Sequence, residues 1–174
     1  MVKSWQSGCL RIECQEANGS HPLEDRPARL FIHALTDGQR QGVVRAEGQL
    51  GIQLAHLLHA CIVLSSNDQS EWYVPTDSHP LHLRRLGQQV EIAKYPTYAF
   101  TSTSWLNNED GLFLVDFGVL LESVSAAVEW VMHDIGDDYA EDDTVQVLVQ
   151  QWERAWQRFS RLATFRRFTL APVL

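Results

Sequence analysis

The spacing of apolar residues changes once along this chain, and that change constrains the fold more than any other feature. Before about Leu121, short runs alternate apolar and polar side chains, as where Leu10 and Ile12 alternate with Arg11 and Glu13. Such alternation is typical of half-buried strands. After Leu121, apolar residues recur at helical spacing, which is typical of amphipathic helices. The sequence therefore predicts strands first and helices last.

Turn-forming residues separate the predicted strands. Asn-Gly, Asp-Gly and proline-containing segments lie between them, and proline cannot donate a hydrogen bond to a sheet ladder. The sequence shows no internal repeat. The runs expected to form strands are 9–14, 29–35, 42–48, 71–75, 90–96, 97–105 and 111–121.

Two helices are predicted after these strands. The first begins at Ser123 or Ser125 and ends at Gly136, and the second runs from Asp143 or Thr144 to about Ala163. On the second helix, one face is apolar and the opposite face carries Arg154, Arg158 and Arg161. The predicted fold is α+β, with a mostly antiparallel sheet from the N-terminal two-thirds and two C-terminal helices packed on one face, in a single domain spanning 1–174.

The most apolar run, residues 51–66, carries His56, His59 and Cys61 and is compatible with either a helix or a strand. On a helix the two histidines would share a face, and on a strand they would lie on opposite faces. A second pair, His79 and His82, makes these four histidines weak candidates for zinc ligands, because no Cys-X-X-Cys or His-Glu-X-X-His motif accompanies them. The favoured interpretation is that these side chains pack, so no metal site is predicted.

Charge is unevenly distributed along the chain, whose formal net charge is −8. Residues 109–143 contain eleven acidic residues and no Lys or Arg, whereas residues 144–174 contain five arginines and one glutamate. An acidic chain is repelled by phosphate backbones, so nucleic-acid binding is not expected. No apolar run reaches membrane-spanning or signal-peptide length, so we expect no membrane association. Three cysteines without Cys-X-X-Cys spacing favour free thiols in the cytoplasm.

Catalytic motifs are not visible in the sequence. It contains no Gly-X-Ser-X-Gly elbow, no phosphate-binding loop and no dinucleotide-binding glycine pattern. Cys61 with His33 or His59 could form a nucleophile and base, but a cysteine in an apolar run is usually a core residue with a raised pKa. We therefore expect neither a cofactor nor, as the first choice, an enzyme.

The leading hypothesis is a small acidic binding or inhibitory protein that docks a basic partner protein. Immunity and antitoxin proteins fill such a role against basic nuclease toxins, and the comparison rests on size and charge alone. Clustered carboxylates would steer association, and uncharged aromatic side chains would anchor the partner. The predicted partner-binding residues are Tyr98, Trp105, Trp130, Asp134, Asp137, Asp138, Glu141 and Asp142.

Three alternatives remain open. The acidic run 133–143 could be a solvated linker between the two helices, whose last acids favour the positive end of the second helix. The chain could be a small-molecule-binding protein or a hydrolase, with or without a metal, whose pocket is lined by histidines. It could also form a homodimer through the helix face that carries Trp152 and Trp156. The pocket histidines would be His33, His56, His59, His79 and His82.

Overall fold

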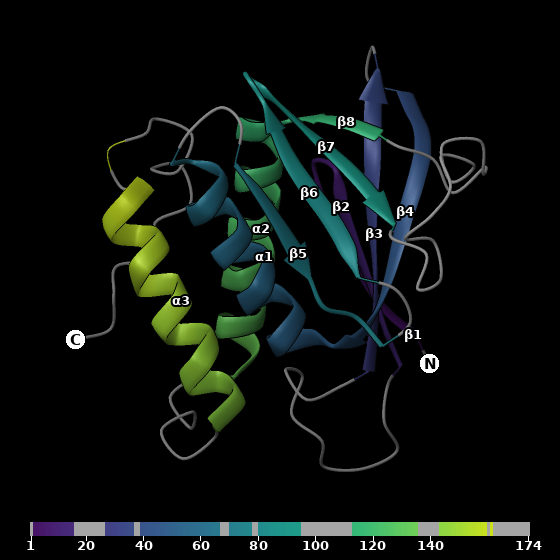
Figure 1. The fold of residues 1–174 in the computed structure, drawn as a ribbon. Coiled ribbons are helices and arrows are strands. Elements are labelled where there is room, and N and C mark those ends of the chain that lie inside the picture. Colours follow the sequence, from purple (N-terminus) through teal and green to yellow (C-terminus); the bar gives the residue numbers. More distant parts are fainter. Residues whose placement is uncertain are drawn as a thin grey trace.

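Two antiparallel sheets and three helices make up the part of the chain that the computed structural model describes (Figure 1). The described residues are 2–15, 27–36, 39–66, 70–77, 80–94, 113–135, 143–159 and 161. The first sheet contains β1 (Val2–Ser7), β2 (Leu10–Gln15), β3 (Pro27–Thr36) and β4 (Gln39–Gln49). The second contains β5 (Glu71–Val74), β6 (Leu81–Leu86), β7 (Gln89–Lys94) and β8 (Phe113–Asp116). The helices are α1 (Leu50–Leu64), α2 (Phe117–Ile135) and α3 (Asp143–Phe159).

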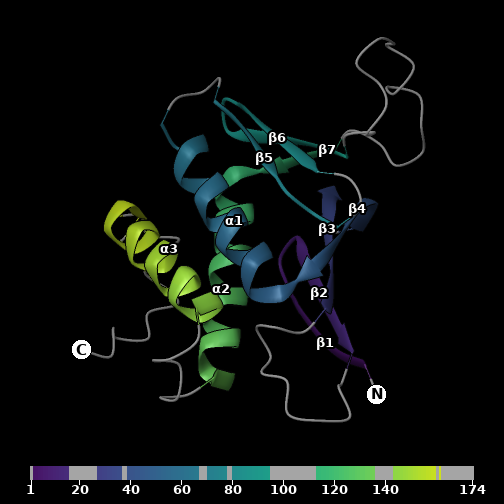
Figure 2. The same ribbon diagram turned by 60° about the horizontal axis from the view of Figure 1, so that its bottom comes forward.

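Each sheet buries one face against the helices. In β2, Leu10, Ile12 and Cys14 are buried, while Arg11 and Glu13 lie on the outer face. Side chains from both sheets and all three helices form one contiguous core. Figures 1 and 2 show α1 and α2 lying between the sheets and α3, which packs on the outer side of α1. This arrangement confirms the predicted α+β class with antiparallel strands and C-terminal helices packed against the rest of the fold. The strands form two sheets and not one, and α3 packs on α1 where both helices were expected on a sheet.

The described chain is built from two similar units, each an antiparallel four-stranded meander followed at once by a helix. The first unit ends in α1, which begins at the residue after β4, and the second ends in α2, which begins at the residue after β8. The helices are exchanged, because α1 packs on β5 of the second sheet and α2 packs on β1 of the first. The sequence did not reveal this repeat, and α3 is an addition that the first unit lacks.

An inward-facing tryptophan on the first strand of each unit marks the exchange. Trp5 of β1 stacks on Trp130 of α2, with ring centroids 5.7 Å apart. Trp72 of β5 lies against His59 of α1, with ring centroids 4.6 Å apart. Each aromatic contact therefore joins a strand of one unit to the helix that the other unit supplies.

Several element boundaries differ from the sequence-based predictions. Strands β1 and β6 were not predicted, run 51–66 is a helix from Leu50 to Leu64, and run 111–121 is half strand and half helix. The α2 helix begins at Phe117 rather than at Ser123, because the Asp116 side chain accepts a hydrogen bond from the Val119 N–H at 3.1 Å and caps the helix. The predicted strand 97–105 lies outside the described residues. Among the described helices, none combines the length and apolar character needed to cross a bilayer.

Candidate functional site

Two of the eight predicted partner-binding residues lie in the C-terminal part of α2. Trp130 and Asp134 belong to α2, whose last residue is Ile135, and α3 begins at Asp143. The acidic segment 136–142 therefore joins the C-terminus of α2 to the N-terminus of α3. Asp143, in the first turn of α3, stands at the positive end of the helix dipole. The predicted residues Tyr98, Trp105, Asp137, Asp138, Glu141 and Asp142 lie outside the described residues.

Trp130 is partly used for packing within the molecule. Its ring stacks on that of Trp5 with an angle of 16° between the ring planes, and both side chains pack against the core. The indole is half-buried, so part of it remains accessible. Trp130 therefore combines an internal packing contact with a partly accessible ring.

A row of four residues on α2, two of them carboxylates, precedes that segment and was not predicted. Glu122, Ala126, Glu129 and His133 recur at helical spacing on one side of α2, and we call this row the α2 acidic stripe. The first three are half-buried and His133 is exposed. The Glu129 Oε1 atom is shielded from solvent and has no hydrogen-bond partner. Burial raises the pKa of this carboxyl to about 7. The signal in the sequence was two glutamates seven positions apart within an otherwise apolar helix.

We expect Glu129→Gln to stabilise the chain at high pH and to leave it unchanged at low pH. The Glu129 pKa rises from 4.5 to about 7 on folding, so the folded state favours the protonated carboxyl. Stability is therefore lost as the pH rises between these values. Because the side chain is partly exposed, the expected gain at pH 8 is below about 1 kcal/mol. Urea unfolding at pH 4 and pH 8 measures it, with Glu153→Gln on exposed α3 as the control. An equal effect of Glu129→Gln at both pH values would contradict the assignment.

The two histidines of α1 are held by neighbouring elements. His59 Nδ1 lies 3.3 Å from Gln151 Oε1 of α3, and its ring contacts Trp72. His56 is half-buried, and burial, aided by nearby His59, lowers its pKa. These contacts support the packing interpretation of run 51–66. His33 is buried on β3.

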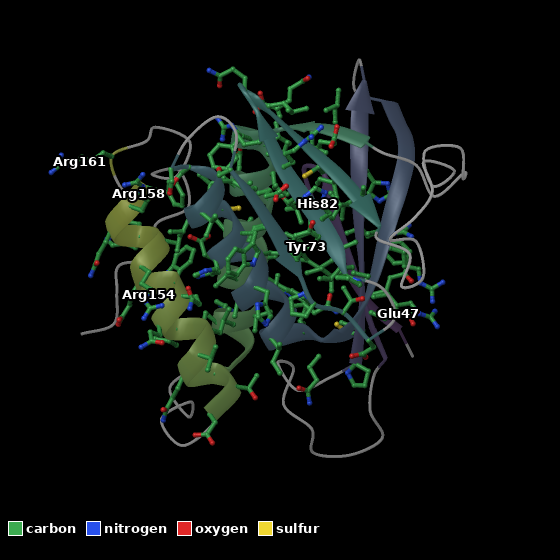
Figure 3. The ribbon with its side chains drawn as sticks, viewed as in Figure 1. Glu47, Tyr73, His82, Arg154, Arg158 and Arg161 are labelled. Atoms are coloured by element: carbon green, nitrogen blue, oxygen red, sulfur yellow. The ribbon has the colours of Figure 1, made fainter. Side chains whose placement is uncertain are left out.

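His82 lies on the other side of the second sheet from α1. Its Nε2 atom is 3.0 Å from Glu71 Oε2, and its ring stacks on Tyr73 with centroids 4.6 Å apart (Figure 3). The sheet thus separates His82 from His56 and His59, so the structure does not bring these weak metal candidates together. His79 lies outside the described residues. Within the described part of the chain, no group of three or more His, Cys, Asp or Glu is placed to hold a metal ion.

The three cysteines are free thiols buried in the core. Burial raises the pKa of Cys9 to about 11 and that of Cys61 to about 12. A thiol with a raised pKa is a poor nucleophile near neutral pH, because the thiolate is the reactive form. Cys61 is therefore a buried core thiol with little thiolate character near neutral pH.

A shallow pocket of about 220 Å³ lies at one end of the first sheet. Its charged lining is already paired in part, because Arg29 Nε lies 3.2 Å from Glu47 Oε1 and Arg45 also contacts that carboxylate. The hydrogen bond from Arg45 is the main cause of the lowered pKa of Glu47. Its lining includes no histidine, so it is not the predicted histidine-lined pocket. The lining residues are Glu13, Cys14, Pro27, Ala28, Arg29, Glu47, Gly48 and Asp77.

Arg154 and Arg158 are exposed side chains of α3, as predicted, and Arg161 is exposed but lies beyond the helix (Figure 3). The helix ends at Phe159 and not near Ala163 as predicted, so Arg161 does not belong to it. Arg158 donates from Nε to Ser65 Oγ at 3.1 Å and from Nη2 to Ser65 O at 3.4 Å. This guanidinium therefore binds the C-terminal end of α1 and fixes α3 to it.

Comparison of the chain with protein-family models, curated proteins and solved structures finds no match. Its function is therefore inferred from its own residues. In the sequence, the α2 acidic stripe is followed directly by the acidic segment before α3.

Proposed function

We propose that this chain is a protein-binding or inhibitory module whose acidic surface docks a basic partner protein, as immunity and antitoxin proteins do against basic toxins. One observation carries the proposal: the carboxylates of the α2 acidic stripe continue into a segment rich in Asp and Glu, with no Lys or Arg from residue 95 to residue 153.

The described thiols and imidazoles favour binding over catalysis. The cysteines are buried with raised pKa values, and His59 and His82 contact Gln151 and Glu71. No described observation favours the alternative of a hydrolase or small-molecule-binding protein with a histidine-lined pocket. We place the module in the cytoplasm, where its free thiols would stay reduced. We infer a protein partner and not a nucleic acid, because like charges repel.

In the proposed mechanism, charged residues attract the partner and an aromatic residue holds it in the complex. Carboxylates on α2 and in segment 136–142 attract a basic surface over a range limited by salt screening. The accessible part of Trp130 then supplies desolvated contact area beside the charges. Charge should therefore govern how fast the complex forms, and aromatic contact should govern how long it lasts.

Affinity capture from native lysate tests whether such a partner exists. The full chain is immobilised at low salt, eluted by a salt step and the eluate identified by mass spectrometry. We expect one stoichiometric basic protein, retained by the original chain and lost by a variant with Asp137→Asn, Asp138→Asn, Glu141→Gln and Asp142→Asn. No stoichiometric protein, or equal retention by both chains, would count against the proposal and favour a solvated linker.

Association kinetics with the captured protein give the quantitative prediction. We expect the association rate to fall at least about tenfold between low and high salt, while the dissociation rate changes much less. The four-residue acidic variant should associate more slowly at low salt, and its association rate should change less with salt concentration. An Arg154→Gln variant serves as the control, because it alters charge on exposed α3 outside the acidic surface. An association rate independent of salt would rule out electrostatic steering.

A further inference from the structure

One buried amide on α1 has no hydrogen-bond partner. The Gln53 side chain is 2% exposed, and within the described part of the chain neither its Oε1 nor its Nε2 atom makes a hydrogen bond. A buried amide that stays unpaired destabilises the folded state, because it has lost its hydrogen bonds to water. Native proteins keep few such groups, so the presence of this one needs a physical reason.

The second unit has an apolar residue at the equivalent position. Matching the first residue of α1, Leu50, to that of α2, Phe117, pairs Gln53 with Leu120. Leu120 is 0% exposed and belongs to the common core. Buried pairs farther along the two helices support the match, namely Leu54 with Leu121, Leu57 with Val124, Ala60 with Ala127 and Cys61 with Val128. The fold therefore accepts an apolar side chain where Gln53 stands, and packing does not require an amide.

The strands next to Gln53 also differ between the two units. Strand register defines one row of residues across each sheet, and the last residue of each row comes two positions before the helix. The rows are Cys14, Ala28 and Gly48 in the first sheet and Arg85, Val90 and Val115 in the second. Alanine and glycine therefore stand where the second sheet has two valines, which leaves more space at this end of the first sheet.

The Gln53 amide and a pocket share this part of the first sheet. A Cβ atom on Gly48 would overlap Gln53 Nε2, so the amide takes the place of a side chain at position 48. Cys14, Ala28 and Gly48 all line the pocket of about 220 Å³ described above, which we call the first-sheet pocket. Its volume equals that of about seven molecules of liquid water, enough for a short aliphatic molecule. The unpaired amide therefore lies against the row of residues that lines this pocket.

A carboxylate at the mouth of the first-sheet pocket is available to a cation. Asp77 is exposed, and its carboxylate makes no ion pair with the described residues. Its backbone N–H donates to Glu47 O at 2.8 Å, which fixes it to β4 at the end of the first sheet (Figure 3). The other two carboxylates among the described lining residues are paired, Glu13 with Arg11 at 3.2 Å and Glu47 with Arg29 at 3.2 Å.

We propose that the first-sheet pocket binds a short aliphatic ammonium compound that carries an amide group at its other end. The ligand amide pairs with Gln53, because an amide offers at once the acceptor that Nε2 lacks and the donor that Oε1 lacks. The ammonium group pairs with Asp77, and the methylene chain packs on Pro27 and Ala28. This site goes beyond the proposed docking of a basic protein and does not depend on it.

Binding of γ-aminobutyramide to the full chain tests the inference. Butyramide lacks the ammonium group of this probe, and butylamine lacks its amide. Two-dimensional NMR of the nitrogen-labelled chain near neutral pH measures all three dissociation constants. We expect γ-aminobutyramide to bind at least about tenfold more tightly than either comparison compound. The side-chain NH₂ signals of Gln53, identified by their absence from a Gln53→Leu variant, should shift on addition of γ-aminobutyramide.

Two variants test the two ends of the ligand separately. Gln53→Leu, which copies Leu120, should weaken binding of γ-aminobutyramide at least about tenfold and leave that of butylamine within about twofold. Asp77→Asn should weaken γ-aminobutyramide at least about tenfold and leave butyramide within about twofold. Glu153→Gln removes an exposed carboxylate on α3 and is the matched control, with all three compounds within about twofold. The free Gln53→Leu chain should also unfold at higher urea concentration, because its buried amide is gone.

The contrary outcomes are equally distinct. Equal affinity for the three compounds, or Gln53 side-chain signals that do not move, would overturn the inference. Loss of binding in Asp77→Asn alone would also overturn it, because the carboxylate would then attract amines without the pocket. If Gln53→Leu does not fold, the comparison of γ-aminobutyramide with butylamine on the original chain decides the amide contact.

Discussion

Leu121→Ala is expected to lower the free energy of unfolding by about 3 to 5 kcal/mol, the usual cost of a cavity at a fully buried leucine. Leu121 of α2 is 1% exposed and belongs to the common core. Its repeat counterpart Leu54 of α1 is 0% exposed, and Leu54→Ala should cost a similar amount. Urea unfolding followed by circular dichroism and tryptophan fluorescence measures both losses.

Val147→Ala on α3 is the matched control, because this side chain is 48% exposed. Its expected cost is within about 0.5 kcal/mol. Both leucine variants should unfold in one transition, since both sheets and all three helices contribute to one core. Two separate transitions would show that the repeat units unfold independently, contrary to the exchange of helices.

Gly8→Ala is expected to destabilise the chain by about 3 kcal/mol. Gly8 has a φ of +49°, a left-handed conformation that costs an L residue about 1 to 2 kcal/mol. A Cβ atom there would also overlap Ser123 Oγ on α2. That hydroxyl accepts a hydrogen bond from Cys9 N–H at 3.1 Å and donates one to Val119 O at 2.6 Å. Displacing it would leave buried polar groups unpaired, which adds about 1 to 3 kcal/mol.

Gly87→Ala separates backbone strain from overlap. Gly87 has a φ of +62°, and a Cβ atom there would meet nothing within 4 Å. Its expected cost is therefore the conformational cost alone, about 1 to 2 kcal/mol. Combining Gly8→Ala with Ser123→Ala should cost less than the sum of the two single variants, because the overlap is removed. Equal costs for Gly8→Ala and Gly87→Ala would mean that Ser123 does not constrain the turn.

The fold class could be predicted because alternation and helical periodicity are local properties of the sequence. The α1 helix stayed ambiguous because the second sheet, α2 and α3 cover most of its surface and leave little polar face to reveal a helical period. The start of α2 was misplaced because Phe113–Asp116 and the first turn of α2 form a run in which Asp116 is the one charged residue among apolar residues. Only the Asp116 cap divides the strand from the helix.

The candidate site was partly accessible from the sequence. The acidic segment before α3 can be recognised in the sequence from its content of Asp and Glu. The packing role of His59 could be predicted because its neighbours in the sequence are apolar. The relation between His82 and Glu71 depends on strand register, which pairs Tyr73 with His82 across β5 and β6. The α2 acidic stripe looked like ordinary surface charge. The buried Gln53 amide stands out only when α1 is matched to α2, and that match requires the folded repeat.

The exchange of helices between the two units also bears on how such a chain could have arisen. A single ancestral unit, made of one meander and one helix, would have left its own sheet uncovered and its helix without a sheet. In a symmetric dimer of two such copies, the helix of each copy would cover the sheet of the other. Fusion of the two genes would preserve that arrangement within one chain. In the chain as it stands, α3 covers one of the two exchanged helices, α1, and has few contacts with the other, α2.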